Sequence, residues 1–455
     1  MEISELYKIF TAHPQVTTDS RDCPQGAIFF ALKGDAFNGN QFARAALEKG
    51  CAVAVIDEPQ FAEPADERYI VVGDVLTTLQ QLANHHRRQL GTPIIGVTGT
   101  NGKTTTKELI SAVLAEKFNV LCTQGNFNNH IGVPKTLLRL TREHDIAVVE
   151  MGANHPGEIK TLANIVEPDC GIITNVGKAH LEGFGSFEGV VRTKGELYDY
   201  LRTKAGSAVF IDNGNEHLLG IAHDLTLIKY GTREAADLSV LGTVESCAPL
   251  LKFTWKRTGS EGNASNIEKS PTQTTNTQPP TPNTHTVQTH LIGSYNIYNM
   301  LAAAAIGLHF GVSEEQVDHA LSHYVPSNNR SQLEKTAHNH LIVDTYNANP
   351  TSMNAALANF RDMEVKPKMA ILGDMRELGS ASAEEHQQVA DILRAAHFDT
   401  VWLVGEEFQK TDCPFRKFHD VDEVKAEIAR QQPRGYYILI KGSNGVKLYQ
   451  LPELL

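Results

Sequence analysis

The 455-residue sequence has little of what marks secreted and membrane proteins. Its six cysteines are scattered and none belongs to a Cys-x-x-Cys pair, which excludes a disulfide scaffold and a zinc site built on such pairs. No apolar run approaches the ~20 residues of a membrane-spanning helix, and residues 1–5 lack the basic and apolar stretches of a secretory signal. The sequence therefore predicts a cytoplasmic protein with reduced thiols and no membrane partner.

Positive charge is also scarce. The 41 Lys and Arg residues stand against 53 Asp and Glu residues, which gives a net charge of −12 and disfavours general binding of nucleic acid. Hydrophobic residues make up 41% of the chain and charged residues 21%, as in ordinary globular proteins. A chain of this length predicts about three domains.

Apolar strands alternate with helical stretches along most of the chain, which is typical of α/β domains with parallel sheets. We expect a small N-terminal α/β domain over 1–91, a central parallel-sheet domain over 92–322 and a C-terminal Rossmann-like α/β domain over 323–455. Strands are predicted at 27–32, 52–56, 93–98, 146–150, 171–176, 207–211, 341–344, 369–373, 400–404 and 437–440, and helices at 41–49, 104–117 and 296–310. Residues 258–290 are rich in Ser, Thr, Asn, Gln and Pro. Such a segment buries too little apolar surface to become ordered, so we expect a flexible surface insertion there.

The most informative motif is the segment GVTGTNGKTT at 96–105, which follows a predicted strand and opens a predicted helix. Glycines let backbone N–H groups surround phosphate oxygens, while a lysine reaches the outer phosphates and a hydroxyl can bind Mg²⁺. We interpret the segment as a phosphate loop, with Val97 where the general pattern has glycine. Such a loop alone predicts a nucleotide-binding domain, and motors, kinases, GTPases and ligases share it.

Two further strands of the same predicted sheet end in polar residues. Glu150 ends the strand at 146–150, and His180 follows the strand at 171–176. Because ligands gather at the carboxyl ends of parallel strands, Glu150 is predicted to hold Mg²⁺ directly or through water. For His180 a structural role and a ligand role stay equally open.

Taken together, these motifs resemble the Mur ligases, ATP-dependent amide synthetases that build the peptide of peptidoglycan precursors. The resemblance rests on 98–105, Glu150, Asn175 with His180, and the run Thr193-Lys194-Gly195-Glu196, and it covers the chain almost end to end apart from 258–290. Within the family, 149–154, 344–353 and 372–379 resemble the branch that adds D-alanyl-D-alanine to UDP-N-acetylmuramoyl-tripeptide through an acyl phosphate. The resemblance implies these two substrates, ATP, two Mg²⁺ ions and a monomer.

The resemblance also implies roles for individual residues. The catalytic residues would be Lys103, His180 and Lys194, the last as a carbamate formed with CO₂. The metal ligands would be Thr104, Glu150, His180 and carbamylated Lys194. ATP would contact Gly99, Thr100, Asn101, Gly102, Lys103, Thr104, Thr105, Asn296, Asn299, Arg330 and Asp344. The other substrates would contact Ser20, Arg21, Gly39, Asn126, Asn128, Asn129, Asn347, Asn349, Asp374 and Lys441. His386 or Asp374 could deprotonate the incoming amine, and the sequence does not choose between them.

Three alternatives remain to be weighed against this interpretation. The preceding ligase of the family, which adds a dibasic amino acid, has an Asp-Asn-Pro-Arg signature where this chain reads YNANP at 346–350. A phosphate-loop motor or regulatory ATPase would hydrolyse ATP without either peptide substrate. A folylpolyglutamate-type ligase would lack the N-terminal unit that grips the UDP end.

Overall fold

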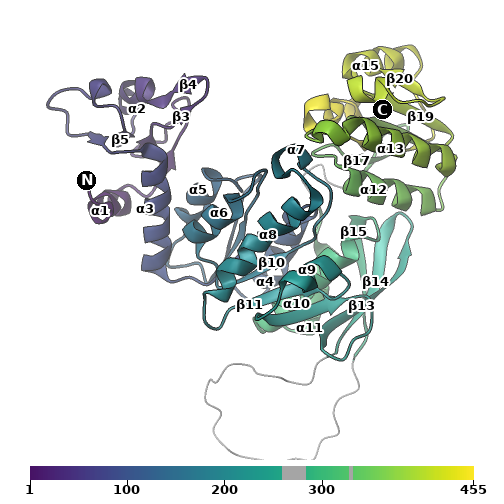
Figure 1. Ribbon diagram of the computed structural model, residues 1–455, viewed down its shortest axis with the longest axis horizontal. Helices are drawn as coiled ribbons and strands as arrows, with labels where there is room; N and C mark the ends of the chain where they lie inside the picture. The colour runs from purple at the N-terminus through teal and green to yellow at the C-terminus, as the bar shows by residue number, and fades with distance from the viewer. Residues whose placement is uncertain (259–282, 327–331) are drawn as a thin grey trace, which may run out of the picture.

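The computed structural model describes residues 1–258, 283–326 and 332–455, which build three larger sheets with helices packed on them (Figure 1). The N-terminal sheet is parallel, in the order β1-β2-β5-β6. Its strands are β1 (Val16–Thr17), β2 (Ile28–Phe30), β5 (Val53–Ile56) and β6 (Tyr69–Val71), and its helices are α1 (Ile3–Ala12), α2 (Ala43–Glu48) and α3 (Val75–Leu90). A short hairpin of β3 (Lys33–Gly34) and β4 (Phe37–Asn38) stands beside the sheet.

The central sheet has nine strands in the order β15-β14-β13-β12-β11-β10-β7-β9-β8. The strands are β7 (Ile94–Thr98), β8 (Val120–Cys122), β9 (Ile146–Glu150), β10 (Cys170–Ile173), β11 (Ala208–Asp212), β12 (Thr226–Gly231), β13 (Leu238–Cys247), β14 (Leu250–Arg257) and β15 (His285–Ile292). The helices are α4 (Lys103–Ala115), α5 (Gly132–Leu137), α6 (Glu158–Val166), α7 (Leu181–Phe184), α8 (Phe187–Arg202), α9 (Glu216–Ile221), α10 (Asn296–His309) and α11 (Glu314–His323). The sheet is parallel from β8 to β13, and β14 and β15 are antiparallel.

The C-terminal sheet has the order β16-β17-β21-β18-β19-β20, parallel except for β16. Its strands are β16 (Gln332–Lys335), β17 (His340–Asp344), β18 (Lys368–Gly373), β19 (Thr400–Val404), β20 (Arg416–Phe418) and β21 (Tyr437–Lys441). Its helices are α12 (Pro350–Asp362), α13 (Ser382–Ala396), α14 (Glu406–Gln409) and α15 (Val421–Arg430). The N-terminal and C-terminal sheets lie on opposite sides of the central one (Figure 1).

The α/β fold with its parallel sheets is confirmed, and every predicted strand overlaps an observed one. One part of the predicted insertion is wrong, because residues 285–290 belong to strand β15, which pairs with β14. Its inward side chains Val287 and Thr289 are buried, while the alternating residues Thr286, Gln288 and His290 are polar and exposed. The prediction missed this alternation because the composition of the whole segment is polar. Residues 259–282 lie outside the described residues.

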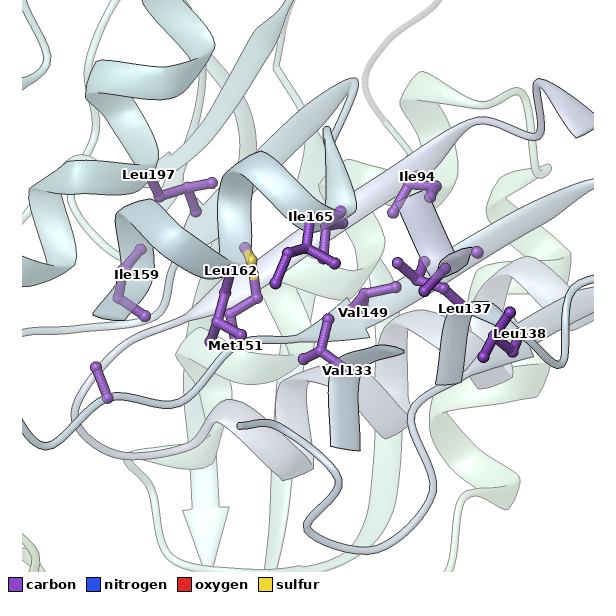
Figure 2. Close-up of a cluster of buried hydrophobic side chains, with 14 of the residues drawn as sticks. Ile94, Val133, Leu137, Leu138, Val149, Met151, Ile159, Leu162, Ile165 and Leu197 are labelled. Carbon is purple, nitrogen blue, oxygen red and sulfur yellow. The ribbon is translucent and has the colours of Figure 1, made fainter. Parts of the chain in front are cut away.

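Helix α3 lies between the N-terminal sheet and the helices that cover the central sheet, and it packs on both. It contacts α1 and β2 on one side and α5 and α6 on the other. Its buried Leu79 and Leu82 belong to one continuous apolar cluster that runs from Phe30 in the N-terminal sheet to Leu137 on α5. In the part of this cluster shown in Figure 2, side chains of α5 and α6 cover β9 and the start of β7. The apolar cores of the N-terminal and central domains are therefore joined.

Among the residues that the structure describes, no helix combines the length and the apolar character that crossing a bilayer requires.

Candidate active site

Three loops of the central domain meet where the strand order reverses. Strand β7 lies between β10 and β9, so the loops after these three strands leave the sheet at one edge. Such a switch point is where open α/β sheets bind ligands. It brings together the loop 99–103, Glu150 at the end of β9 and the segment 174–180 after β10.

The phosphate loop is held in shape by the segment that follows β10. Thr100 donates its backbone N–H to the Asn175 carbonyl at 2.9 Å, and the Asn101 N–H donates to Asn175 Oδ1 at 3.0 Å. Gly99 has φ +142°, and a Cβ there would lie 2.1 Å from Thr174 Oγ1, so this position requires glycine. Lys103, the first residue of α4, donates from Nζ to the carbonyls of Gly99 and Thr100, each at 2.9 Å. The lysine therefore spans the concave loop in which phosphates would bind.

Thr104 and Glu150 form a pair of oxygen ligands beside this loop. Thr104 Oγ1 donates to Glu150 Oε2 at 3.0 Å, and both residues are buried. The other carboxylate oxygen accepts from Asn128 Nδ2 at 2.8 Å. A hydroxyl and a carboxylate held in contact are the hard oxygen ligands that Mg²⁺ prefers, so the residues present fit a magnesium ion.

Lys194 on α8 is buried beneath the same edge. Its Nζ donates to the Ala153 carbonyl at 3.2 Å and lies 5.2 Å from the centre of the Phe184 ring. Burial, and then the positive charge of Lys103, lower the pKa of the Lys194 ammonium to about 7. Near neutral pH a large part of this amine is therefore uncharged and nucleophilic.

His180 lies between the central and C-terminal domains. It has φ +50° at the N-terminus of α7, and its Nδ1 is paired with the Glu377 carboxylate. Burial lowers its pKa, against the effect of Glu377, and the positive charges of Lys103 and Lys194 lower it further. The structure thus brings His180 near Lys103 and Lys194 and links it to the C-terminal domain.

Contacts with the C-terminal domain reach the phosphate loop itself. Asn349, the N-cap of α12, donates from Nδ2 to Asn101 Oδ1 at 2.8 Å and accepts the Ser352 N–H at 2.9 Å. Lys178 forms an ion pair with buried Glu385 at 2.7 Å. Asn349 therefore connects the domains in this conformation and does not line the cavity between them.

That cavity has a volume of about 1180 Å³ and is bounded by the central and C-terminal domains together with α3. The predicted residues that line it are Thr100, Asn101, Gly102, Lys103, Thr105, Asn126, Asn128, Asn129, Glu150, His180, Asn296, Asn299, Asp344, Asn347 and Lys441. Gly99, Thr104 and Lys194 are not part of the described lining. Arg330 lies outside the described residues.

At one side of the cavity, Asn296 and Asn299 are hydrogen-bonded to each other. Asn299 Nδ2 donates to Asn296 Oδ1 at 2.7 Å, and Asn299 Oδ1 accepts from Thr106 Oγ1 at 3.0 Å. On the opposite side, β17 and β21 pair in parallel so that Asp344 and Lys441 are neighbours. Lys441 Nζ lies 2.6 Å from Asp344 Oδ2 and is buried.

Two residues of the C-terminal domain with predicted roles lie outside the described cavity lining. The Asp374 carboxylate accepts the N–H groups of Glu407 and Phe408, each at 3.0 Å, at the start of α14. His386 is fully buried, with Nε2 accepting the Met375 N–H at 3.0 Å and Nδ1 bonded to the Ser382 carbonyl at 2.7 Å. Neither residue lines the cavity in the described part of the chain. Both side chains are hydrogen-bonded within the C-terminal domain and do not face the cavity lining, so we do not expect either to deprotonate the amine.

We accordingly expect Asp374→Ala to affect stability more than substrate binding. Losing both bonds to the start of α14 should lower the free energy of unfolding by about 1–3 kcal/mol. The KM for the amine substrate should change less than about twofold, within the small effect of a residue outside the site. Urea unfolding and initial rates on one preparation measure both. A KM increased tenfold with unchanged stability would return Asp374 to the substrate pocket.

The predicted residues of the N-terminal domain lie apart from the cavity, whose described lining includes none of Ser20, Arg21 or Gly39. The Arg21 side chain is 88% exposed and paired with Asp19 at 2.7 Å. A Cβ at Gly39 would lie 2.2 Å from the Leu32 carbonyl oxygen, so packing of the backbone accounts for this glycine.

Sequence reasoning missed several residues of the cavity wall, which are Gln80, Asn154, Glu158, Asp212, Tyr298 and Thr351. Asp212 ends strand β11, so the strand-end argument applied to Glu150 would have found it. Burial raises the pKa of the Asp212 carboxyl. For Gln80, on the side of α3, the sequence offers no comparable signal.

Comparisons with known proteins agree with this geometry. Family models match at residues 14–87 (Mur ligase family, catalytic domain), 97–307 (Mur ligase middle domain) and 329–444 (Mur ligase, glutamate ligase domain). UDP-N-acetylmuramoyl-tripeptide–D-alanyl-D-alanine ligases are similar along their length. The one from Bacillus subtilis is 33% identical over 99% of this chain and 96% of its own, and the one from Escherichia coli is 34% identical over 97% and 93%.

Solved structures are similar as well. A crystal structure of MurF from Acinetobacter baumannii has a TM-score of 0.82 and 30% identity, and covers 96% of this chain and 92% of its own. The MurF ligase from Thermotoga maritima in complex with ADP has a TM-score of 0.81 at 24% identity, covering 97% of this chain and 96% of its own. At that identity the second likeness concerns the fold.

Proposed function

The chain belongs to the Mur ligase family, and from this premise we propose that it joins D-alanyl-D-alanine to UDP-N-acetylmuramoyl-tripeptide at the expense of ATP. The observation that carries the proposal is one shared cavity. One wall holds a phosphate loop with Lys103 and Glu150, and the opposite wall, with Asn347 and Lys441, comes from the C-terminal domain. A phosphorylated acid and an amine can therefore meet between the domains. The alternative ligase that adds a dibasic amino acid is not favoured by the relatives.

The chemistry explains why such a cavity is needed. A carboxylate is a poor acyl donor because its oxygen is a poor leaving group. Transfer of the γ-phosphoryl group of ATP to the terminal carboxylate of the tripeptide gives an acyl phosphate. The amine of D-alanyl-D-alanine then attacks the acyl carbon, and phosphate leaves as the amide forms. Lys103 reduces the repulsion between the carboxylate and the triphosphate, and closure of the domains keeps water from the acyl phosphate.

Two pairs of residues would hold magnesium, and in the first pair Thr104 is hydrogen-bonded to Glu150. Thr104 and Glu150 would bind the first ion, and His180 with a carbamate on Lys194 would bind the second. Bound ions would neutralise charge on the transferred phosphoryl group. The carbamate proposal is supported by the buried Lys194 amine, since only an uncharged amine adds to CO₂, and the pKa of about 7 keeps much of it uncharged.

The remaining assignments are proposed on the same premise. Ser20, Arg21 and Gly39 would serve the UDP end of the substrate, and Asn126, Asn128 and Asn129 its muramyl-peptide side. Asn296, Asn299 and Asp344 would contact ATP, as would Arg330 outside the described residues. We further propose a monomer, working in the cytoplasm where ATP and UDP-linked precursors occur.

The test is release of phosphate from ATP with each substrate omitted in turn. We expect release only when UDP-N-acetylmuramoyl-tripeptide and D-alanyl-D-alanine are both present, with the amide product in equal amount by mass spectrometry. A parallel reaction supplies UDP-N-acetylmuramoyl-dipeptide and a dibasic amino acid. Product in that reaction alone would identify the preceding ligase. Phosphate release indifferent to both peptides would identify a motor or regulatory ATPase.

A further inference from the structure

A buried lysine on the helix of the phosphate loop has no role in the ligase reaction as proposed. Lys107 lies one turn after Lys103 on α4 and is only 1% exposed. Its Nζ donates to the Thr123 carbonyl at 2.8 Å and lies 3.5 Å from Glu108 Oε1. An ammonium group is rarely buried so completely unless such bonds compensate for the loss of water. Lys107 therefore holds the Thr123 carbonyl at a fixed position beside α4.

Thr123 is in turn bonded to the end of strand β9. It directly follows strand β8 and is fully buried. Its backbone N–H donates to the Val148 carbonyl at 3.1 Å, and its Oγ1 accepts the Glu150 N–H at 3.0 Å. The backbone on both sides of Val149 is thus bonded to this one threonine. Because Glu150 ends the strand, Thr123 fixes the point from which its carboxylate extends.

The segment that follows Thr123 carries another polar partner of Glu150. Asn128 donates from Nδ2 to Glu150 Oε1 at 2.8 Å, and its carbonyl accepts the Gly152 N–H at 2.7 Å. A Cβ at Gly152 would lie 2.9 Å from the Asn128 side chain, so the two segments are closely packed. A displacement of Thr123 would therefore disturb both the backbone of Glu150 and the segment that carries Asn128.

We propose that Lys107 is a positioning residue for the magnesium pair Thr104 and Glu150, and that it acts through Thr123. Helix α4 supplies Thr104 as one ligand, and one turn later it supplies the ammonium group that holds Thr123 against the strand of the other ligand. The distance between the hydroxyl and the carboxylate is thereby tied to a single helix. Mg²⁺ requires nearly ideal octahedral geometry, so a small shift of Glu150 weakens its binding. This step rests on the proposed function, which places magnesium at this pair.

Lys107→Met is expected to weaken binding of the ion. Methionine keeps the apolar part of the side chain but leaves the Thr123 carbonyl without the ammonium donor. Loss of a group that orients a metal ligand commonly costs about 10- to 100-fold in metal affinity, and we expect the Kd for the ion to rise by that factor. Lys107 is not among the described residues that line the cavity. The Kd for ADP without metal should therefore change less than about twofold.

The experiment titrates Mn²⁺ into the full-length protein, present in excess over ADP, and follows the electron paramagnetic resonance signal of the free ion. Mn²⁺ is the probe because the oxygen ligands that suit Mg²⁺ also suit Mn²⁺. The Kd for ADP is measured separately without metal. Thermal unfolding without ligands, on the same preparations, establishes that each variant is folded.

Two variants of Thr123 test the connection itself. Thr123→Val removes the hydroxyl that accepts the Glu150 N–H, and the Kd for Mn²⁺ should rise by about tenfold or more. Thr123→Ser keeps the hydroxyl and should bind Mn²⁺ within about twofold of the unchanged protein. Ser111→Ala is the matched control on α4, because Ser111 donates to the Lys107 carbonyl at 2.8 Å and lies outside the connection. Its Kd for Mn²⁺ should also stay within about twofold.

Weaker Mn²⁺ binding by Lys107→Met and Thr123→Val, with Thr123→Ser and Ser111→Ala unchanged, would support the positioning role. Binding of Mn²⁺ by all four variants as in the unchanged protein would overturn it, as would equal losses in the two Thr123 variants. An equal loss of ADP affinity without metal would indicate a distorted phosphate loop and also overturn it. If Lys107→Met does not fold, the two Thr123 variants decide. The expected pattern in a protein without ligase activity would support the positioning role and reject the proposed function.

Discussion

Replacing Lys103 with alanine is expected to lower kcat by about two to three orders of magnitude or more, the usual cost of removing one preorganised charge from a reacting centre. The reason is electrostatic. The reaction brings a carboxylate against a triphosphate, and the two anions repel each other. Lys103 is a cation of the phosphate loop, and its ammonium is hydrogen-bonded to carbonyls of that loop. Phosphate release with both peptide substrates at saturation measures the loss.

The matched control for this experiment is Lys117→Ala. Lys117 follows the same helix α4, where it donates to the Gly311 carbonyl at 2.8 Å, away from the cavity. It should keep kcat within about twofold, as surface substitutions commonly do. Equal thermal unfolding of the two variants would exclude a folding defect. Turnover of Lys103→Ala at the control's rate would remove the electrostatic account of the first step.

Replacing Lys194 with alanine is expected to reduce kcat by about two orders of magnitude, because a proposed metal ligand is lost. The buried space that the side chain leaves should admit short-chain carboxylic acids, so acetate should restore part of the rate. Lys160→Ala, at an exposed position of α6, is the control that acetate should not affect. Full activity of Lys194→Ala without additives would rule out the carbamate.

The same lysine predicts a pH dependence. The pKa of about 7 means that the neutral amine predominates above that pH and the ammonium below it. After removal of CO₂, reactivation of the enzyme by bicarbonate should therefore be faster at pH 8 than at pH 6, because these values lie about one unit above and one unit below the pKa. Reactivation that is equally fast at both pH values would place the modification elsewhere.

Local sequence patterns predicted most of the fold, including the individual strands. Apolar runs such as 146–150 and 437–440 are buried on both faces of a sheet, so their composition alone marks them. The phosphate loop was equally predictable, because binding of phosphate requires glycine, lysine and threonine at a fixed spacing. Strand β15 escaped because its exposed face is polar and its buried face is only half of the residues.

The part of the site that escaped prediction depends on how the domains meet. Nothing in the spacing around Asn349 indicates a bond to Asn101, which is 248 positions away in the sequence. Glu150 is the last residue of buried strand β9, and Asp374 directly follows buried strand β18. Yet the Asp374 carboxylate caps a helix, and the Glu150 carboxylate reaches the helix that opens at the phosphate loop. A strand end thus predicts that an acid lies at the sheet edge, and tertiary packing decides which partner it finds.

The position of α3 determines which domains can move relative to each other. Parting the first two sheets would expose the apolar side chains of that helix to water, at a cost of about 25 cal/mol for each Å², so these sheets should travel as one rigid block. The third sheet meets the phosphate loop through polar bonds such as Asn101 to Asn349, which water can replace at little cost. We therefore expect substrates to enter by movement of the C-terminal domain, while the N-terminal and central domains stay together.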